Sequence, residues 1–319
     1  MLSALFTAAV AGDRRSVARA ISAVENRSQG VLEAIASLSP RRVLGPGGPH
    51  VVGVTGPPGS GKSTLTDRLI SEARARDLRV GVVAIDPSSP FTGGAILGDR
   101  LRMEAHASDP GVFIRSLASR GHLGGLSRAT GQVVDLFDAA GFDLVIVETV
   151  GVGQSELSVM EVADTVLVVL TPESGDVVQT MKAGLLEVAD LFVVNKADRP
   201  GADHLRRELE AMVHLEDLGA QGPRWAAPVL ATSALERRGL AELMEAVRAH
   251  LAWCCGEGRG AWAARRGAGR VRTFLDLVSE DARERAARWL RGSTLEAELV
   301  SGAVNPYLAA SSWREERGS

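Results

Sequence analysis

In Gly56-Pro57-Pro58-Gly59-Ser60-Gly61-Lys62-Ser63 the chain carries the pattern G-x-x-x-x-G-K-[ST] of a phosphate-binding loop. Glycine permits the tight, positive-φ turns by which such a loop directs its backbone N–H groups at phosphate oxygens. An apolar run precedes the loop at residues 50–55 and apolar residues at helical spacing follow it, so the loop is expected between a strand and a helix. A chance glycine-rich turn would lack this context. We predict a nucleoside triphosphate site in which Lys62 contacts phosphate and the Ser63 hydroxyl binds Mg²⁺.

The composition is that of an ordinary globular protein. Of 319 residues, 45% are apolar and 24% are charged, and the net charge of −3 gives no reason to expect a nucleic-acid or membrane partner. The only cysteines are adjacent, Cys254 and Cys255, a spacing that suits neither a zinc site nor a disulfide framework. No apolar run is long enough to cross a bilayer, and no basic residue precedes the first apolar stretch. We therefore expect a cytoplasmic protein.

Apolar runs alternate with helical stretches between residues 45 and 252. This alternation predicts an α/β fold with a mainly parallel sheet and helices on both faces. Ligands of such sheets bind at the carboxyl ends of the strands. Residues 1–44 are predicted to form a helical extension, and residues 253–319 a helical arm. The strands expected after the loop are residues 80–86, 112–114, 144–149, 165–170, 191–195 and 229–232.

Acidic residues follow two of these runs. Asp86 closes one of them and Asp99 lies further along the same connection, where either carboxylate can bind Mg²⁺ or act as a helix cap. Glu148 ends an apolar strand in the manner of a Walker B acid, and the Gly151 N–H is placed to sense a γ-phosphate. Gln154 is a candidate to orient the attacking water, and equally a neighbour of the next helix's N-cap.

The base is indicated by Asn195-Lys196-Ala197-Asp198, which fits N-K-x-D. A carboxylate accepts hydrogen bonds from guanine N1 and N2, a donor pair that adenine lacks. The expected cofactors are therefore GTP or GDP with Mg²⁺. Catalytic roles are predicted for Lys62, Asp86, Asp99 and Glu148, and metal binding for Ser63, Asp86, Asp99 and Glu148. The predicted nucleotide contacts are Gly56, Pro57, Pro58, Gly59, Ser60, Gly61, Lys62, Ser63, Thr64, Gly151, Asn195, Lys196, Asp198, Ser233 and Ala234.

Four of the five tryptophans lie in the predicted arm, at Trp253, Trp262, Trp289 and Trp313. Large aromatic anchors on a small helical region suggest an interface. Packing of the arm onto the main domain explains them equally well. The six histidines are scattered and show no metal-ligand spacing.

Several longer motifs resemble those of the MeaB-type GTPases, also called ArgK, which accompany methylmalonyl-CoA mutase. The resemblance covers nearly the whole chain, and the run from Glu148 to Glu156 is far more specific than a phosphate loop alone. One departure is Glu236-Arg237-Arg238, where a glycine-rich turn is expected after Ser233-Ala234. The similar motifs are Asp86-Pro87-Ser88-Ser89, Gly98-Asp99-Arg100, Arg120-Gly121-His122-Leu123-Gly124-Gly125-Leu126, Glu148-Thr149-Val150-Gly151-Val152-Gly153-Gln154-Ser155-Glu156, Asn195-Lys196-Ala197-Asp198 and Asn305-Pro306-Tyr307.

The resemblance implies a GTP-hydrolysing chaperone of an adenosylcobalamin-dependent acyl-CoA mutase, which gates cofactor delivery and protects or reactivates the mutase. It also implies a homodimer formed through the arm, and a mobile segment facing the mutase at residues 171–182. Two other classes remain open, as does a minimal reading as a GTP-binding scaffold, which a hydrolysis assay would separate. A nickel-insertion GTPase is expected to carry a Cys or His cluster near its switches, and a small-molecule kinase would not need N-K-x-D.

Overall fold

The structure is a computed structural model and describes residues 2–38, 48–86, 103, 105–118, 125–149, 162–174, 189–217 and 224–317. Seven strands form one sheet in the order β3-β2-β4-β1-β5-β6-β7, and every neighbouring pair is parallel. The predicted α/β class is therefore confirmed. The strands are β1 (His50–Thr55), β2 (Val80–Asp86), β3 (Val112–Ala118), β4 (Leu144–Thr149), β5 (Thr165–Leu170), β6 (Leu191–Val194) and β7 (Val229–Ala231).

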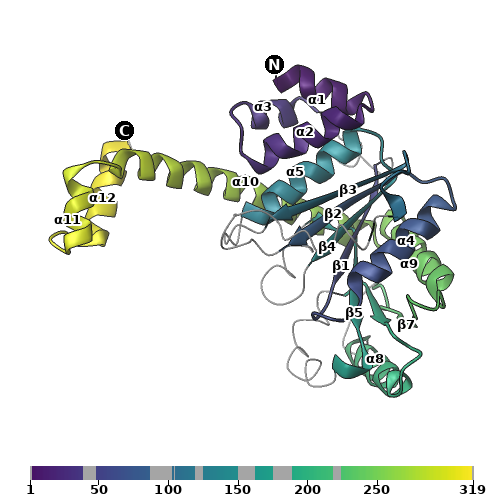
Figure 1. The fold of residues 1–319 in the computed structure, drawn as a ribbon. Helices are drawn as coiled ribbons and strands as arrows, with labels where there is room; N and C mark the ends of the chain where they lie inside the picture. The colour runs from purple at the N-terminus through teal and green to yellow at the C-terminus, as the bar shows by residue number, and fades with distance from the viewer. Residues whose placement is uncertain are drawn as a thin grey trace. The chain divides into compact units, whose positions relative to one another are not determined.

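Helices cover both faces of the sheet because the central strands are buried on both sides (Figure 1). Along β5, Val166 and Val168 belong to one apolar cluster, while Leu167 and Val169 belong to the other. The first cluster includes residues of α5 (Gly125–Ala139) and α8 (Ala202–Asp217). The second includes residues of α4 (Lys62–Arg74) and α9 (Leu240–Cys255).

The N-terminal extension is helical, as predicted. It comprises α1 (Leu2–Val10), α2 (Arg14–Glu25) and α3 (Val31–Ala36), all of which contact α5. The strand β3 is longer than the apolar run at 112–114 because Arg115 continues it and pairs with Glu25 of α2. This ion pair ties the extension to the edge of the sheet.

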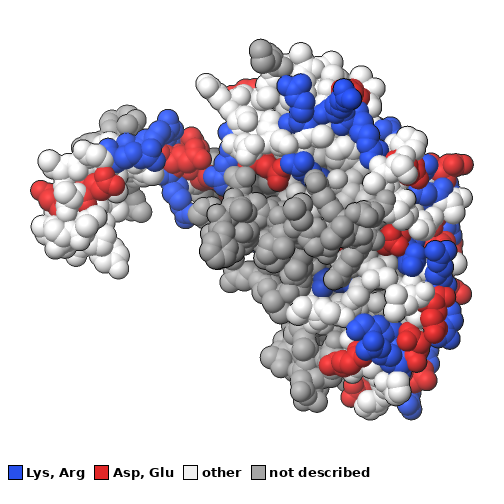
Figure 2. Space-filling model, viewed as in Figure 1, with Lys and Arg blue, Asp and Glu red and all other residues white. Residues whose placement is uncertain are grey.

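The chain forms two compact units, residues 1–269 and 270–319. The helix α10 (Arg259–Leu290) begins in the first unit, and α11 (Thr294–Ser301) and α12 (Pro306–Arg317) belong to the second. Among the described helices, none has an apolar stretch long enough to span a membrane. Basic and acidic side chains lie interspersed over the described part of the face seen in Figure 2. On α8, Arg206 and Glu210 form an ion pair.

Candidate nucleotide-binding site

The glycine-rich loop connects β1 to α4 at the carboxyl edge of the sheet. Gly56, Gly59 and Gly61 have φ of 140°, 78° and 85°, in the left-handed region that side chains rarely adopt. At Gly56 a Cβ would lie 2.1 Å from the Val169 carbonyl oxygen, and at Gly61 it would lie 2.5 Å from Asn195 Nδ2. Glycine is therefore required at both positions by neighbouring strands as well as by the turn itself.

Lys62 is buried against the loop that precedes it. Its ammonium donates to the backbone carbonyls of Gly56 at 2.8 Å and Pro57 at 2.9 Å. The same residue opens α4, so its positive charge coincides with the positive end of the helix dipole. This combination favours an anion.

Two predicted metal ligands meet beside the loop. The Ser63 hydroxyl donates to Glu148 Oε1 at 2.6 Å, and both side chains are buried. The contact follows from the sheet order, because β1 pairs with β4 and Val54 lies opposite Glu148. Carboxylate and hydroxyl oxygens are hard ligands of the kind that Mg²⁺ prefers, so this donor set fits the ion.

Asn195, directly after β6, lies between the phosphate loop and the loop after β7. Its Nδ2 donates to the Ser60 carbonyl at 2.9 Å. Its Oδ1 accepts from the Thr232 hydroxyl and from the Ala234 N–H, both at 3.3 Å. A single amide side chain thus fixes the spacing of three loops.

Asp198 is held by the loop after β7. The Ser233 hydroxyl donates to Asp198 Oδ1 at 2.6 Å. This bond is the main reason that the pKa of Asp198 lies below its usual value, so the group stays ionised at neutral pH. The second oxygen, Oδ2, does not take part in this bond, and a carboxylate oxygen in this loop suits the donors of guanine.

The loop after Ser233 closes tightly although it contains no glycine at residues 236–238. Ser233 and Arg238 exchange two backbone hydrogen bonds of 3.1 Å each, and Arg237 takes the positive φ of 58°. Gly239 follows at φ 72° and begins α9, where a Cβ would approach the Ala231 carbonyl oxygen to 2.2 Å. The glycine expected in this turn is therefore Gly239, one position after Glu236-Arg237-Arg238.

Glu173 was not among the predicted site residues, and it follows β5 in the short 3₁₀ turn Pro172–Ser174. Its carboxylate pairs with Arg199 and lies 3.9 Å from the Lys196 ammonium. The hydrogen bond from Arg199 is the largest cause lowering the pKa of Glu173 to about 2. The sequence did contain one signal for Glu173. The residue follows β5, and the carboxyl end of this strand lies at the same edge of the sheet as the N-K-x-D loop.

Some predicted residues lie outside the described part of the chain. Asp99, Gly151 and Gln154 are among them, as are residues 175–182 of the segment expected to face a partner. Asp86 is described by its backbone, which ends β2 in register with Ala118 of β3.

Comparisons with known proteins agree with one another. The model of one protein family, described as methylmalonyl Co-A mutase-associated GTPase MeaB, matches residues 17–289. A putative GTPase of Pyrococcus horikoshii is 52% identical over 239 residues, 75% of this chain and 74% of that protein. The GTPase ArgK of Escherichia coli is 41% identical over 248 residues, 74% of this chain and 72% of that protein.

A mammalian protein and a solved structure extend the similarity to nearly the whole chain. The Mus musculus protein named methylmalonic aciduria type A homolog, mitochondrial, is 32% identical over 323 residues, covering 96% of this chain and 77% of that protein. A solved structure named LAO/AO transport system kinase matches with a TM-score of 0.68 and 28% identity over 100% of this chain and 98% of its own.

Proposed function

Because the chain belongs to the MeaB family of methylmalonyl-CoA mutase-associated GTPases and is itself a GTPase, we propose that it serves an adenosylcobalamin-dependent acyl-CoA mutase as a chaperone. The family match over residues 17–289 carries this proposal. The most direct partner is methylmalonyl-CoA mutase. The GTPase gates delivery of the cofactor to the mutase and protects or reactivates it in the cytoplasm.

The proposed cofactors are GTP or GDP with Mg²⁺. The loop from Gly56 to Ser63 binds the phosphates through its backbone N–H groups, with Lys62 as the nearby cation. Ser63 and Glu148, joined by a 2.6 Å hydrogen bond, are the side chains that would hold Mg²⁺, together with Asp86 and Asp99. Bound Mg²⁺ supplies positive charge that offsets the charge on the transferring phosphoryl group. The protein's own contribution is to position the phosphates and the attacking water.

Guanine is selected by Asp198, with Lys196 along the base and Asn195 bracing the loop. The support is the Ser233–Asp198 hydrogen bond, which keeps a carboxylate ionised at the expected place. Adenine presents an acceptor where guanine has its N1 donor, so an ionised carboxylate there disfavours ATP.

We also propose a homodimer formed through the arm. Val271, Phe274, Leu275 and Val278 recur at helical spacing on α10, and each is 47–62% exposed. One exposed apolar stripe of this kind favours association, and a second copy of the chain offers a matching stripe.

The guanine assignment is tested by calorimetry with GTP and ATP in the presence of Mg²⁺. GTP is expected to bind at least about a hundredfold more tightly, because ATP leaves the charged acceptor of Asp198 without its donors. Equal affinity for the two nucleotides would contradict the proposed site. Asp198→Ala removes both carboxylate oxygens and serves as the reference, in which the preference for GTP over ATP is lost.

The chaperone role is tested by hydrolysis with and without a mutase. Slow turnover of the isolated protein and faster turnover with methylmalonyl-CoA mutase are expected, because Glu148-Thr149-Val150-Gly151 is not followed directly by a glutamine to position water. Rapid isolated turnover without any response to the mutase would remove the basis for this role.

A kinase is the second candidate, since one solved relative is named as a transport-system kinase. The two functions differ in where the γ-phosphoryl group goes. Radiolabelled GTP should yield inorganic phosphate in a GTPase, whereas label on an added amino-acid or protein acceptor would indicate a kinase.

A further inference from the structure

A cavity of about 210 Å³ opens at the amino ends of β5 and β6, at the edge of the sheet opposite to the phosphate loop. Its walls include α9, the first turns of α10 and the segment before β7, all within the unit of residues 1–269. An apolar cavity of about 150 Å³ is known to admit benzene, whereas drug-sized ligands need roughly 300 Å³ or more. The size therefore fits one ring with a small substituent.

Aromatic side chains dominate the walls. Trp225, Trp253 and Trp262 all line the cavity. The rings of Trp225 and Trp253 lie 5.9 Å apart, and Trp253 stacks on His250 at an interplanar angle of 19°. The indole N–H groups of Trp225 and Trp262 donate to the Asp190 carbonyl and to Asp164. With these polar edges bound to the protein, the indoles offer a ligand their apolar surfaces.

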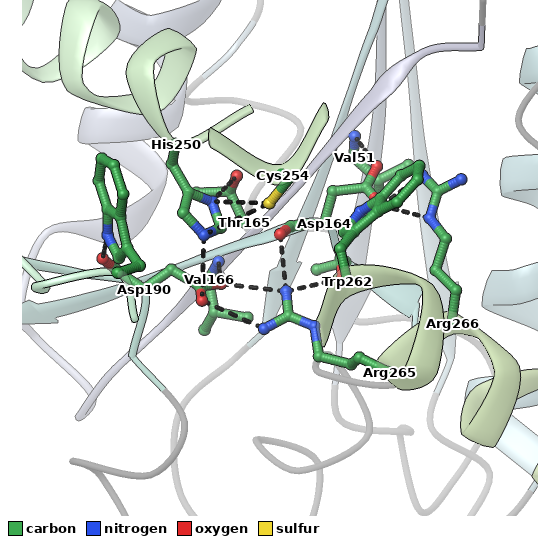
Figure 3. Close-up of polar contacts among 12 residues, drawn as sticks. Val51, Asp164, Thr165, Val166, Asp190, His250, Cys254, Trp262, Arg265 and Arg266 are labelled. Atoms are coloured by element: carbon green, nitrogen blue, oxygen red, sulfur yellow. Dashed lines mark hydrogen bonds and ion pairs between the residues drawn. The ribbon is translucent and has the colours of Figure 1, made fainter. Parts of the chain in front are cut away.

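The histidine in the wall, His250, contacts the polar side chains around it (Figure 3). Asp190 Oδ1 lies 3.4 Å from His250 Nε2, and Cys254 Sγ lies 3.6 Å from the same nitrogen. His250 Nδ1 and the Thr165 hydroxyl share a hydrogen bond of 2.7 Å, and the same hydroxyl shares one of 2.6 Å with His50 Nε2. Burial lowers the pKa of His250, so the ring is neutral at pH 7 and brings no charge to the cavity.

Arginine supplies the remaining polar groups. Arg265 donates from Nη1 and Nη2 to the two oxygens of Asp190, each at 3.1 Å, and from Nη2 to the Asp164 carbonyl at 2.6 Å. Asp190 is also bonded to the Val166 N–H, so its charge is compensated by the protein. Of the five guanidinium donors, Nε–H and one Nη1–H of Arg265 have no acceptor within the part of the chain that the structure describes. Arg224 adds a second guanidinium to the lining.

From this lining we propose a second ligand site, for a small aromatic carboxylate. The ring occupies the space between the indoles, and the carboxylate accepts from the donors of Arg265 that the protein leaves available. A cationic ring is disfavoured because the lining carries two guanidinium groups against one compensated carboxylate. Moreover, the face of Trp262 already holds a cation, with Arg266 Cζ 4.0 Å from the ring centroid. Residues of α9 and of the first turns of α10 both line the site, so its ligand stabilises the contact between these two helices.

The test uses benzoate, benzamide and benzylammonium on the full chain, with GDP and Mg²⁺ in excess so that the phosphate loop is blocked. Tryptophan fluorescence and ligand-observed NMR report binding. Benzoate should bind saturably at one site with a dissociation constant of about 1 mM, a usual value for a ligand of this size. Benzamide should bind more weakly, and benzylammonium not at all. No saturable binding of benzoate, or equal binding of benzylammonium, would overturn the proposal.

Two variants on α10 locate the site. Ala261 lines the cavity, whereas Ala264 is exposed on the same helix and does not. Ala261→Phe should weaken benzoate binding by at least about tenfold because its ring competes for the cavity, and Ala264→Phe should leave it unchanged. Circular dichroism and GDP affinity check that both variants fold. Unchanged benzoate binding in a folded Ala261→Phe protein would place the ligand elsewhere and overturn the assignment.

Discussion

Asn195 donates from Nδ2 to the backbone carbonyl of Ser60 at 2.9 Å, a bond that joins the base-reading loop to the phosphate loop. The two residues come from the ends of different strands, β6 and β1, which are separated in the sheet by β5. Because Asn195 Oδ1 also accepts from Thr232 and Ala234, the amide cannot turn over without losing bonds on both sides. The distance between phosphate and base positions is therefore set before any nucleotide arrives.

Asn195→Asp tests this connection. The substitution keeps the shape of the side chain but turns the donor into a charged acceptor facing the Ser60 carbonyl. GTP affinity measured by calorimetry should fall by about tenfold or more, since a hydrogen bond is replaced by a repulsion. Asn305→Asp is the matched control, because Asn305 is exposed and its Oδ1 already acts as an acceptor for the Tyr307 N–H. Equal affinities in the two variants would mean that the connection does not influence binding.

Asp198→Asn should change the base that is bound. The Ser233 hydroxyl donates to Oδ1, so an asparagine keeps its oxygen there and turns its amide N–H groups toward the base. Xanthine presents a carbonyl where guanine presents its amino group. Affinity for GTP should fall by at least about a hundredfold while xanthosine triphosphate binds better than it does to the wild type. Calorimetry with both nucleotides decides it, and a variant that still prefers GTP would show that Asp198 does not read the base.

The positions of the strands and their parallel arrangement could be predicted because each buried strand is a short run of β-branched and aliphatic residues between clear breaks. The N-K-x-D loop and the phosphate loop were recognisable for the same reason: their chemistry is written in consecutive residues. The resemblance to the MeaB family rested on such local strings, and the family match confirms it. In contrast, the turn at Arg237 was misjudged, since a non-glycine residue takes a positive φ there and only the surrounding hydrogen bonds reveal it.

Contacts between distant residues were not predictable. His50 and His250 looked like scattered histidines, yet both hydrogen-bond to Thr165 because the starts of β1 and β5 meet the end of α9. Two of the arm tryptophans, Trp253 and Trp262, contact His250 and Asp164 within the unit of residues 1–269. No periodicity in one helix can distinguish these outcomes, because the partner surface lies elsewhere in the sequence.

The buried histidine His50 should make stability depend on pH. Burial lowers its pKa from 6.5 to about 4, so the unfolded chain binds the proton more readily than the native protein between these values. The contribution of His50 to the free energy of unfolding is fully present above pH 6.5 and declines as the pH falls to 4. For a pKa shift of this size the decline is about 3 kcal/mol. Urea unfolding of the wild type at pH 7 and pH 4 measures the loss.

His50→Gln isolates that contribution. Glutamine retains an N–H donor for the Thr165 hydroxyl but does not titrate. Between pH 7 and pH 4 the free energy of unfolding of the variant should therefore fall by about 3 kcal/mol less than that of the wild type. His204→Gln is the control, because the His204 side chain is 73% exposed on α8. If His50→Gln and His204→Gln show the same pH dependence, the acid sensitivity arises from other groups.

Truncation of the arm should depend sharply on where the chain is cut. Asp164 is 1% exposed and accepts from the Trp262 indole and from Arg266, both in the first turns of α10. A variant ending at Gly269 keeps these donors and loses the apolar stripe of α10, so it should be monomeric by light scattering and bind GTP normally.

A variant ending at Leu251 also loses these donors, whereas the Val51 N–H, which donates to Asp164 Oδ2 at 3.0 Å, remains. Removal of one partner of a buried ion pair costs about 3–5 kcal/mol, so this shorter protein should unfold at clearly lower urea concentration than the variant ending at Gly269. Asp164→Asn in the variant ending at Gly269 provides the matched reference for loss of the charge without loss of the helix. A dimeric protein after the cut at Gly269 would place the dimer contact on the GTPase body, and equal stability of the two truncated proteins would show that Trp262 and Arg266 do not anchor α10.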